Sequence, residues 1–455
     1  MQKQYTIAGM AGLLLVGLLS FFTPEALGAG VIVLIFGLFF TVIFRHYITD
    51  PSFATKIFLI GLAVRLVFGV LVYAMDWREF FGGDAMTYHF RGLALLEYWM
   101  GLIPPDAPEL LRATSMAGPG WGMTYLTGTL YFIFGDNFLA AQTFCAALGA
   151  ATAPLAYACA EKIFQNRRVA RLTAFGVALF PSFVIWSGQL MKDGLIIFLL
   201  VLSILMVMSL QEKFSYLAVV ILVLALGGII TLRFYIFYMV VVAVAGSFII
   251  GVTNSPASLV RRVAALVVMG VALTYLGVTS TATSDFERYA DLERIQISRD
   301  DLARSAESGF GEDIDVSTTQ GALTALPIGF IFLMLAPFPW MMTNLRQAIT
   351  LPEVLLWYAM IPFGVWGIWY SIKHKLRAAL PILLFSVMLT LVYSIFQGNV
   401  GTAYRQRTQI QVFLFMFIAV GWVLYKERKE DRKLLAQAKR RRIVPGIGED
   451  VQGVG

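Results

Sequence analysis

Long, nearly uncharged apolar runs limit how this chain can fold more than any other feature of its sequence. A helix that crosses a bilayer needs about 20 predominantly apolar residues, and such runs recur along most of the chain. Strands of a membrane barrel are much shorter, about 9–11 residues, and lipid tolerates no unpaired backbone groups. The sequence therefore predicts an all-α polytopic membrane protein with about 12–14 transmembrane helices. The candidate spans are residues 8–22, 27–44, 55–75, 118–134, 138–163, 169–186, 194–210, 214–231, 235–251, 263–280, 321–343, 353–371, 378–396 and 408–425.

The composition excludes a soluble domain. Only 14% of the 455 residues are charged and 58% are hydrophobic, whereas soluble domains carry about 25% charged residues. The first run, residues 8–22, has little flanking charge and no convincing small-residue cleavage site, so we expect an anchor rather than a removed signal peptide. Cys145 and Cys159 fall on one predicted helix, about 21 Å apart, and cannot pair with each other.

The net charge of +7 comes from basic residues at the ends of the apolar runs and in residues 426–442. Cytoplasmic loops of membrane proteins are enriched in Lys and Arg. We therefore expect the tail and the basic loop at residues 162–171 to face the cytoplasm. A tail that faces lipid headgroups explains the charge without a nucleic acid partner. Residues 76–137, 281–320 and 397–407 then face the opposite side.

Two apolar segments break this alternation of sides. Residues 118–134 would place the basic loop at 162–171 outside if they crossed, so we expect an interfacial or re-entrant helix there. Residues 321–343 raise the same problem, and a Pro-Phe-Pro-Trp sequence at 337–340 interrupts them. Residues 281–320 form the only long polar insert. We expect a loop there, either a functional lid or a solvated spacer.

Four groups of ionisable residues lie at helix ends on the predicted outer side. In the first, Asp84 follows a Gly-Gly pair and precedes Tyr88, His89 and Arg91. Ionisable groups beside the bilayer are costly and are commonly kept for chemistry. A helix that begins at Asp84 places Tyr88 one turn along the same face. The alternative is structural, because Asp is a favoured helix N-cap.

The second and third groups lie in short turns between apolar helices. Lys192 and Asp193 begin one predicted helix, and Arg233 and Tyr235 lie in the turn between two others. The structural alternatives are a cap for Asp193, a Lys192 ammonium that reaches the membrane surface, and an interfacial anchor for Arg233. Together with Asp84, these groups place two carboxylates and several cations on one side of the membrane.

The fourth group, Tyr404, Arg405 and Arg407, precedes the last apolar run and follows two glycines. The planar fork of arginine matches a phosphate group, so the pair of arginines is a candidate phosphate clamp, with simple anchoring as the alternative. A carboxylate can take the proton of an acceptor hydroxyl, and cations can stabilise a departing lipid phosphate. The sequence carries no Walker or dinucleotide-binding motif.

The order of these segments resembles the GT-C superfamily of polytopic glycosyltransferases, including the bacterial aminoarabinose and mannosyl-protein transferases, over roughly residues 55–425. The matching features are Asp84 in a first outer loop, interfacial helices that end in Phe134-Gly135, and a second outer Asp at position 193. The resemblance implies an inverting enzyme that moves a sugar from a polyprenyl-phosphate donor to a glycan, lipid or protein acceptor. It places the enzyme in the bacterial cytoplasmic (inner) membrane with its active site facing the periplasm.

The resemblance implies that Asp84 is the catalytic carboxylate, that Asp193 is a metal-site or acceptor-site residue, and that Arg405 or Arg407 is the arginine before the last helices. It leaves open a divalent metal ion near the two carboxylates, and it does not identify the sugar. The candidate catalytic residues are Asp84 and Asp193, and the candidate substrate-binding residues are Tyr88, His89, Arg91, Lys192, Arg233, Tyr235, Tyr404, Arg405 and Arg407.

Two features depart from the GT-C pattern: two extra helices precede the loop that carries Asp84, and no large soluble C-terminal domain follows the last span. One alternative function is a polysaccharide polymerase or ligase that relies on Arg405 and Arg407. Another is a lipid-linked sugar flippase or transporter, which predicts ionisable residues buried near mid-bilayer. The ionisable residues here lie mainly at the ends of the apolar runs, except Arg65, which lies inside the run 55–75. A non-catalytic assembly subunit also stays open. The expected regions are the extra helices (1–54), a catalytic membrane core (55–280), the polar loop (281–320), C-terminal helices (321–425) and a basic tail (426–455).

Overall fold

A computed structural model of the chain describes residues 24–114, 120–250, 256–275, 277–289, 291–304, 308–311, 314–342 and 345–443. Within these ranges the chain is helical, and its β-structure is limited to one isolated bridge between Gly309 and Asn399. The helices in chain order are α2 (Pro24–Tyr47), α3 (Pro51–Ala74), α4 (Asp84–Trp99), α5 (Pro108–Thr114), α6 (Trp121–Phe134), α7 (Phe138–Phe164), α8 (Arg167–Leu179), α9 (Pro181–Ser187), α10 (Lys192–Glu212), α11 (Tyr216–Leu232), α12 (Phe234–Ile250), α13 (Pro256–Tyr275), α14 (Val278–Tyr289), α15 (Leu292–Arg304), α16 (Thr319–Leu335), the short 3-10 helix η1 (Pro339–Met341), α17 (Leu345–Ala348), α18 (Leu351–His374), α19 (Leu376–Phe396) and α20 (Val400–Ile443).

The helices confirm an all-α polytopic membrane protein. Among the described residues, seven helices are long and apolar enough to cross a bilayer, and up to nine if α8 with α9, and α13 with α14, each form one bent span. The expected number of about 12–14 is larger because α11, α12 and α16 are shorter apolar helices. The expected span at residues 8–22 lies outside the described residues.

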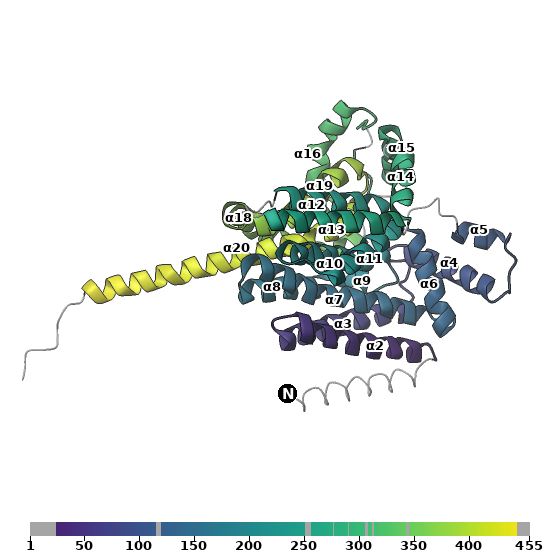
Figure 1. Ribbon diagram of the computed structural model, residues 1–455, viewed down its shortest axis with the longest axis horizontal. Helices are drawn as coiled ribbons and strands as arrows, with labels where there is room; N and C mark the ends of the chain where they lie inside the picture. Colours follow the sequence, from purple (N-terminus) through teal and green to yellow (C-terminus); the bar gives the residue numbers. More distant parts are fainter. Residues whose placement is uncertain are drawn as a thin grey trace, which may run out of the picture.

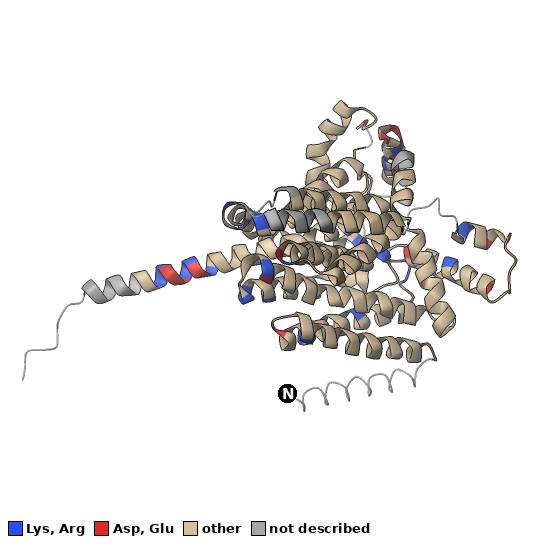
Figure 2. Ribbon diagram, viewed as in Figure 1, with Lys and Arg blue, Asp and Glu red and all other residues tan. Residues whose placement is uncertain are grey.

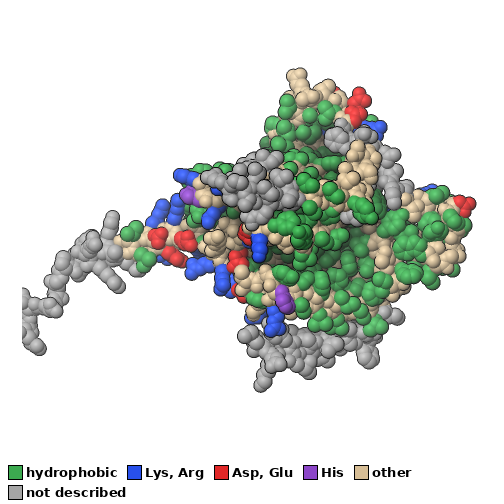
Figure 3. Space-filling view, viewed as in Figure 1, with side chains coloured by type: hydrophobic (Ala, Val, Ile, Leu, Met, Phe, Trp, Pro, Cys, Tyr) green, Lys and Arg blue, Asp and Glu red, His purple; other side chains and the backbone are tan. Residues whose placement is uncertain are grey.

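Helix α7 forms the centre of the bundle and packs against α2, α3, α8 and α10. It is the most deeply buried of the spanning helices, because its many alanines let neighbouring backbones approach closely. The outer surface of the helix bundle, in contrast to the small residues of α7, carries large apolar side chains. Figure 3 shows hydrophobic side chains across most of the visible face, and Leu38, Val67 and Val365 are among the exposed apolar residues.

The spanning helices run roughly parallel, so the molecule has two distinct ends (Figure 1). The charged part of α20 extends from one end, and helices α4, α5 and α6 lie at the other. Figure 2 shows basic residues gathered at the end with the tail, as the distribution of Lys and Arg in the sequence predicted. The carboxylates and arginines of the candidate site lie toward the opposite end, where α4 begins.

The outer segments bear on two sequence expectations. Residues 118–134 include α6, which has 14 residues and is not among the candidate spans, in line with the expected interfacial or re-entrant helix. Residues 281–320 were expected to be a loop, but they contain the end of α14 and all of α15, so much of this segment is helical. Helix α15 has apolar Ile295 packed in a small core beside α16, which explains why this polar stretch forms a helix.

Candidate active site

Asp84 is the first residue of α4, and a tight turn places it there. Gly82 in this turn has φ +138°, a backbone conformation that L side chains rarely adopt. The N-cap of α4 is Gly83, so the side chain of Asp84 does not cap the helix. The structural alternative for Asp84 is therefore wrong, and its carboxylate is used in a contact with another part of the chain.

Asp193, at the start of α10, likewise has another partner than the helix. The N-cap of α10 is Met191, and it makes no side-chain cap bond. The side chain of Asp193 is 0% exposed. A fully buried carboxylate is costly unless it is paired and hydrogen-bonded. The partners of Asp193 therefore define the centre of the site.

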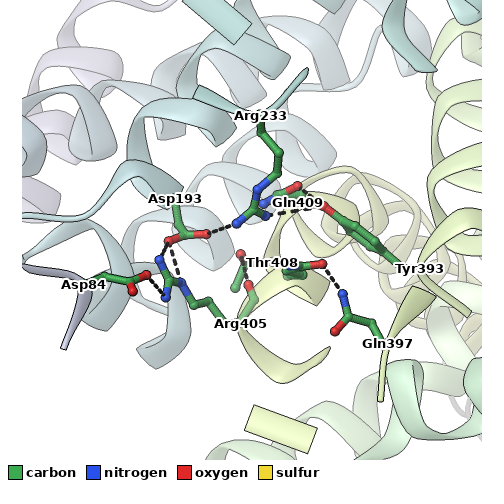
Figure 4. Close-up of polar contacts among 9 residues, drawn as sticks. Asp84, Asp193, Arg233, Tyr393, Gln397, Arg405, Thr408 and Gln409 are labelled. Carbon is green, nitrogen blue, oxygen red and sulfur yellow. Dashed lines mark hydrogen bonds and ion pairs between the residues drawn. The ribbon is translucent and has the colours of Figure 1, made fainter. Parts of the chain in front are cut away.

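Arg405 of α20 joins the two carboxylates. Its Nη1 donates to Asp84 Oδ2 at 2.6 Å, and its Nε donates to Asp193 Oδ2 at 2.6 Å. Nη2 lies 2.5 Å from the same oxygen of Asp193. The fork of one guanidinium thus holds α4, α10 and α20 together (Figure 4). Such charge-assisted bonds are about twice as strong as neutral ones.

Arg233 continues the network on the far side of Asp193. Its Nη2 lies 3.5 Å from Asp193 Oδ1, and its Nη1 lies 3.5 Å from the hydroxyl of Tyr393. Tyr393 in turn donates to Gln409 Oε1 at 2.6 Å. Figure 4 shows this series of contacts running from Asp84 into the bundle. Asp193 is therefore enclosed by two arginines, and its side chain is closed to solvent.

Lys192 lies beside this network without a carboxylate partner within ion-pair distance among the described residues. Its Nζ lies 6.0 Å from the centre of the Tyr88 ring. A Cβ added at Gly120 would lie 2.7 Å from the same Nζ, so glycine leaves room for the ammonium. Burial, reinforced by Asp84, raises the pKa of Tyr88, so its hydroxyl stays protonated at neutral pH and can donate a hydrogen bond.

The other predicted residues of α4 and α12 divide between this site and its surroundings. The ring of Tyr235 lies 6.0 Å from that of Tyr393, so Tyr235 borders the network. His89 Nδ1 lies 2.8 Å from the Tyr131 hydroxyl of α6, and burial lowers the pKa of this histidine. Arg91 is half-buried, and it forms no ion pair with the network among the described residues. His89 and Arg91 therefore do not join the central ion pairs.

Arg407 does not join Arg405 in a clamp. The structure starts α20 at Val400, earlier than the sequence suggested, so both arginines lie inside a helix. Residues two positions apart in a helix point about 200° from each other around its axis. Arg407 is 0% exposed and its Nη1 donates to the carbonyls of Met334 and Ala336 at 3.0 and 2.9 Å. The polymerase or ligase alternative, which used both arginines together, loses this geometric basis.

A cavity of ≈ 790 Å³ opens beside Arg405. Among the described residues that line it, two are arginines, Arg346 and Arg405, and none is Asp or Glu. Aromatic side chains support both cations: Arg405 lies 5.6 Å from the Trp186 ring, and Arg346 lies 5.3 Å from the Phe80 ring. The remaining lining residues are Phe81, Gly82, Ile185, Ser308, Pro337, Leu345, Gln347, Ile349, Thr350, Asn399, Val400, Gly401, Thr402 and Tyr404.

Tyr404 reaches both the cavity and the interior. Its ring borders the cavity, and its hydroxyl donates to Glu353 Oε2 of α18 at 2.7 Å. Sequence reasoning missed Glu353, Arg346, Phe80 and Trp186. The available signal for Arg346 was a lone cation in the connection between two apolar runs, six residues after Trp340.

The residues present do not fit a divalent metal site, which the sequence had left open. In the part of the chain that the structure describes, no three His, Cys, Asp or Glu side chains gather where a metal ion could bind. Asp84 and Asp193 are both engaged by the guanidinium of Arg405. The positive charge between the two carboxylates is therefore supplied by the protein itself.

A comparison with known protein families gives a match to part of this chain. Residues 120–279 match the family model described as dolichyl-phosphate-mannose-protein mannosyltransferase. The matched segment contains Asp193 and Arg233, whereas Asp84 and Arg405 lie outside it. A comparison with curated proteins found no match. The family match covers residues 120–279 of the 455 and, together with the many membrane-spanning helices, supports an integral-membrane glycosyltransferase of the GT-C type.

Proposed function

We propose that this glycosyltransferase moves a sugar from a polyprenyl-phosphate donor to an acceptor on the periplasmic face of a bacterial inner membrane. Asp84 is the catalytic carboxylate in this proposal. The observation that carries it is the cavity next to Asp84, whose described lining combines two arginines and many apolar side chains with no acidic residue. A cavity of this chemistry fits an amphiphilic anion, and a lipid phosphate is such a ligand.

The border of the cavity supports entry of the donor from the membrane. Leu345 and Ile349 line the cavity and are 68% and 49% exposed, and Trp340 nearby in the sequence is 77% exposed. Exposed aromatic and aliphatic residues next to a cation are typical of the membrane interface. The polyprenyl chain therefore stays in lipid while its phosphate contacts Arg346. Lys192, which has no carboxylate partner among the described residues, stabilises the charge that develops in the site.

The proposed reaction is a single displacement. Arg405 binds Oδ2 of Asp84, which leaves Oδ1 to accept the proton of the acceptor hydroxyl. The acceptor oxygen forms a bond to the anomeric carbon as the bond from that carbon to the phosphate oxygen breaks. The electron pair leaves with the polyprenyl phosphate, whose charge the cations stabilise. Attack from the side opposite the phosphate inverts the anomeric centre.

Arg346 provides the test of the donor site. Arg346→Ala is expected to weaken binding of undecaprenyl phosphate about tenfold to hundredfold, because one charge-assisted hydrogen bond contributes about 1.5–3 kcal/mol. Arg346→Lys should recover only part of the affinity, since it keeps the charge but lacks the planar fork. The dissociation constant of undecaprenyl phosphate for the purified protein in detergent measures both effects.

The control for Arg346 is Arg112→Ala. Arg112 is an exposed cation of α5, outside the cavity lining. This variant should bind undecaprenyl phosphate as the unaltered protein does. Equal binding by Arg346→Ala and the unaltered protein would show that the phosphate binds elsewhere, with Lys192 as the next candidate.

The proposed orientation can be measured by labelling single cysteines in intact cells. Cysteines introduced in residues 162–171 and 426–442 are expected to resist a membrane-impermeant reagent, because basic segments stay in the cytoplasm. A cysteine in residues 281–320 should react. The buried Cys145 and Cys159 are replaced by Ala first. Periplasmic labelling of residues 162–171 would overturn both the orientation and the interfacial assignment of α6.

A further inference from the structure

Arg65 is a fully buried arginine that pairs with no carboxylate in the part of the chain that the structure describes. It lies in the middle of α3 and is 1% exposed. Its guanidinium makes four hydrogen bonds, all to neutral groups: the carbonyls of Gly61, Val177 and Ala178, and the hydroxyl of Ser187. The lining of the donor cavity does not include it. The transporter alternative needs such a residue to face a substrate pathway. In the structure, the guanidinium of Arg65 instead donates its hydrogen bonds to groups within the protein.

Two of these bonds join Arg65 to the break between α8 and α9. The chain bends by 52° there, between Leu179 and Pro181. The Val177 carbonyl would pair with the N–H of residue 181 in a continuous helix, but Pro181 has none. Arg65 Nη2 donates to this carbonyl at 3.2 Å, and Nη1 donates to the Ala178 carbonyl at 2.9 Å. Arg65 therefore satisfies the carbonyls that the bend leaves open.

The fourth bond joins Arg65 to a serine that packs against the start of α10. Arg65 Nε donates to Ser187 Oγ at 2.7 Å, and Ser187 is the last residue of α9. A Cβ added at Gly194 would lie 2.5 Å from the Cβ of Ser187, so the first turn of α10 lies directly against this serine. Asp193 is the residue before Gly194. The contacts thus run from Arg65 through Ser187 to the backbone that carries Asp193.

We propose that Arg65 is a positioning residue, which acts through Ser187 to fix the start of α10 and with it the carboxylate that holds Arg405. The proposal rests on the proposed function, because the network of Asp193, Arg405 and Asp84 is taken as the reacting site. Catalytic geometry is sensitive to such positioning, since a shift of about 1 Å can lower a rate about a hundredfold. Arg65 does not contact the substrate in this proposal.

Ser187→Ala isolates the connecting step. It removes the acceptor of Arg65 Nε but leaves the bonds from Arg65 to the three carbonyls. The expected result is a turnover number about tenfold to hundredfold lower, with a melting temperature only a few degrees lower, because one buried Nε–H loses its acceptor. The affinity for undecaprenyl phosphate should change less than about threefold, because Arg346 is not held by α10. Ser203→Ala is the matched control, since Ser203 is a buried serine of α10 that bonds only to the Leu199 carbonyl of its own helix.

The double variant Arg65→Lys with Ser187→Ala tests whether the two residues act as one unit. It should be no slower than Arg65→Lys alone, because residues in one network are not additive. Normal turnover by Ser187→Ala, or fully additive losses, would overturn the proposal.

Hydrogen exchange separates a failure of this inference from a failure of the proposed function. Amides at the start of α10 should exchange faster in Ser187→Ala than in Ser203→Ala, whether or not the protein transfers a sugar. If the unaltered protein uses no polyprenyl-phosphate sugar but exchange still rises, the proposed function is wrong and the contact stands. Unchanged exchange would count against the positioning role itself.

Discussion

Asp84→Asn is expected to lower the rate of sugar transfer by at least about a hundredfold. General acid–base catalysis contributes about 10²–10⁴-fold to enzyme rates, and an amide cannot accept the proton of the acceptor hydroxyl. The substitution preserves shape, and the amide oxygen can still accept the bond from Arg405. The measurement is the rate at which the purified enzyme releases undecaprenyl phosphate from a panel of undecaprenyl-phosphate sugars, with the affinity for undecaprenyl phosphate followed in parallel.

Asp76→Asn is the control for Asp84. Asp76 lies in the same segment before α4, its side chain is 77% exposed, and it pairs only with Arg78 nearby in the sequence. This variant should transfer sugar at the rate of the unaltered enzyme. If Asp84→Asn also turns over normally, another group accepts the proton and the assignment of Asp84 fails.

Arg405→Ala is expected to destabilise the protein by about 3–5 kcal/mol, as well as to abolish transfer. Removing one partner of a buried ion pair leaves an uncompensated charge, and losses of about this size follow. Asp193 would retain only Arg233, at 3.5 Å. The melting temperature in detergent should therefore fall clearly, in contrast to Asp84→Asn.

A double variant separates the buried charge from the loss of packing. Arg405→Met with Asp193→Asn removes both the arginine and the charge that it neutralises. It should be more stable than Arg405→Met alone, because the neutral amide costs less to bury than an unpaired carboxylate. If Arg405→Ala melts with the unaltered protein, the ion pairs of Arg405 do not contribute to stability and the central role given to this residue is wrong.

Helix ends explain which site residues the sequence could reveal. Asp84 stood out because a carboxylate where a long apolar segment leaves the bilayer is costly to keep there, and the same reasoning found Asp193, Arg233 and Arg405. Composition and local position are sufficient for such inferences, because they depend on the cost of burying charge. The pairing of Arg405 with Asp84 and Asp193 was not available to this reasoning, since the contacts join residues 321 and 212 positions apart.

The arginines of α20 show where local reasoning stops. Arg405 and Arg407 look equivalent in the sequence, but the residue at which α20 begins decides that they point in different directions. The boundaries of the helix follow from its packing against α18 and α10 rather than from the apolar pattern. Arg407 therefore serves the interior and Arg405 serves the site. Arg346 was missed for the related reason that only the folded chain brings α17 beside the cavity.

The sequence by itself determined the all-helical membrane fold, the two ends of the molecule by charge, and the presence of ionisable residues at one end. These properties follow from length, hydropathy and the cost of charge in lipid, which act on each segment separately. Only the tertiary structure decided that one arginine pairs with both carboxylates, that Arg65 supports the bend between α8 and α9, and that a cavity with two arginines lies beside Asp84. These depend on packing between distant helices, because burial leaves a charged group to be stabilised by whichever partners the fold places within a few ångströms.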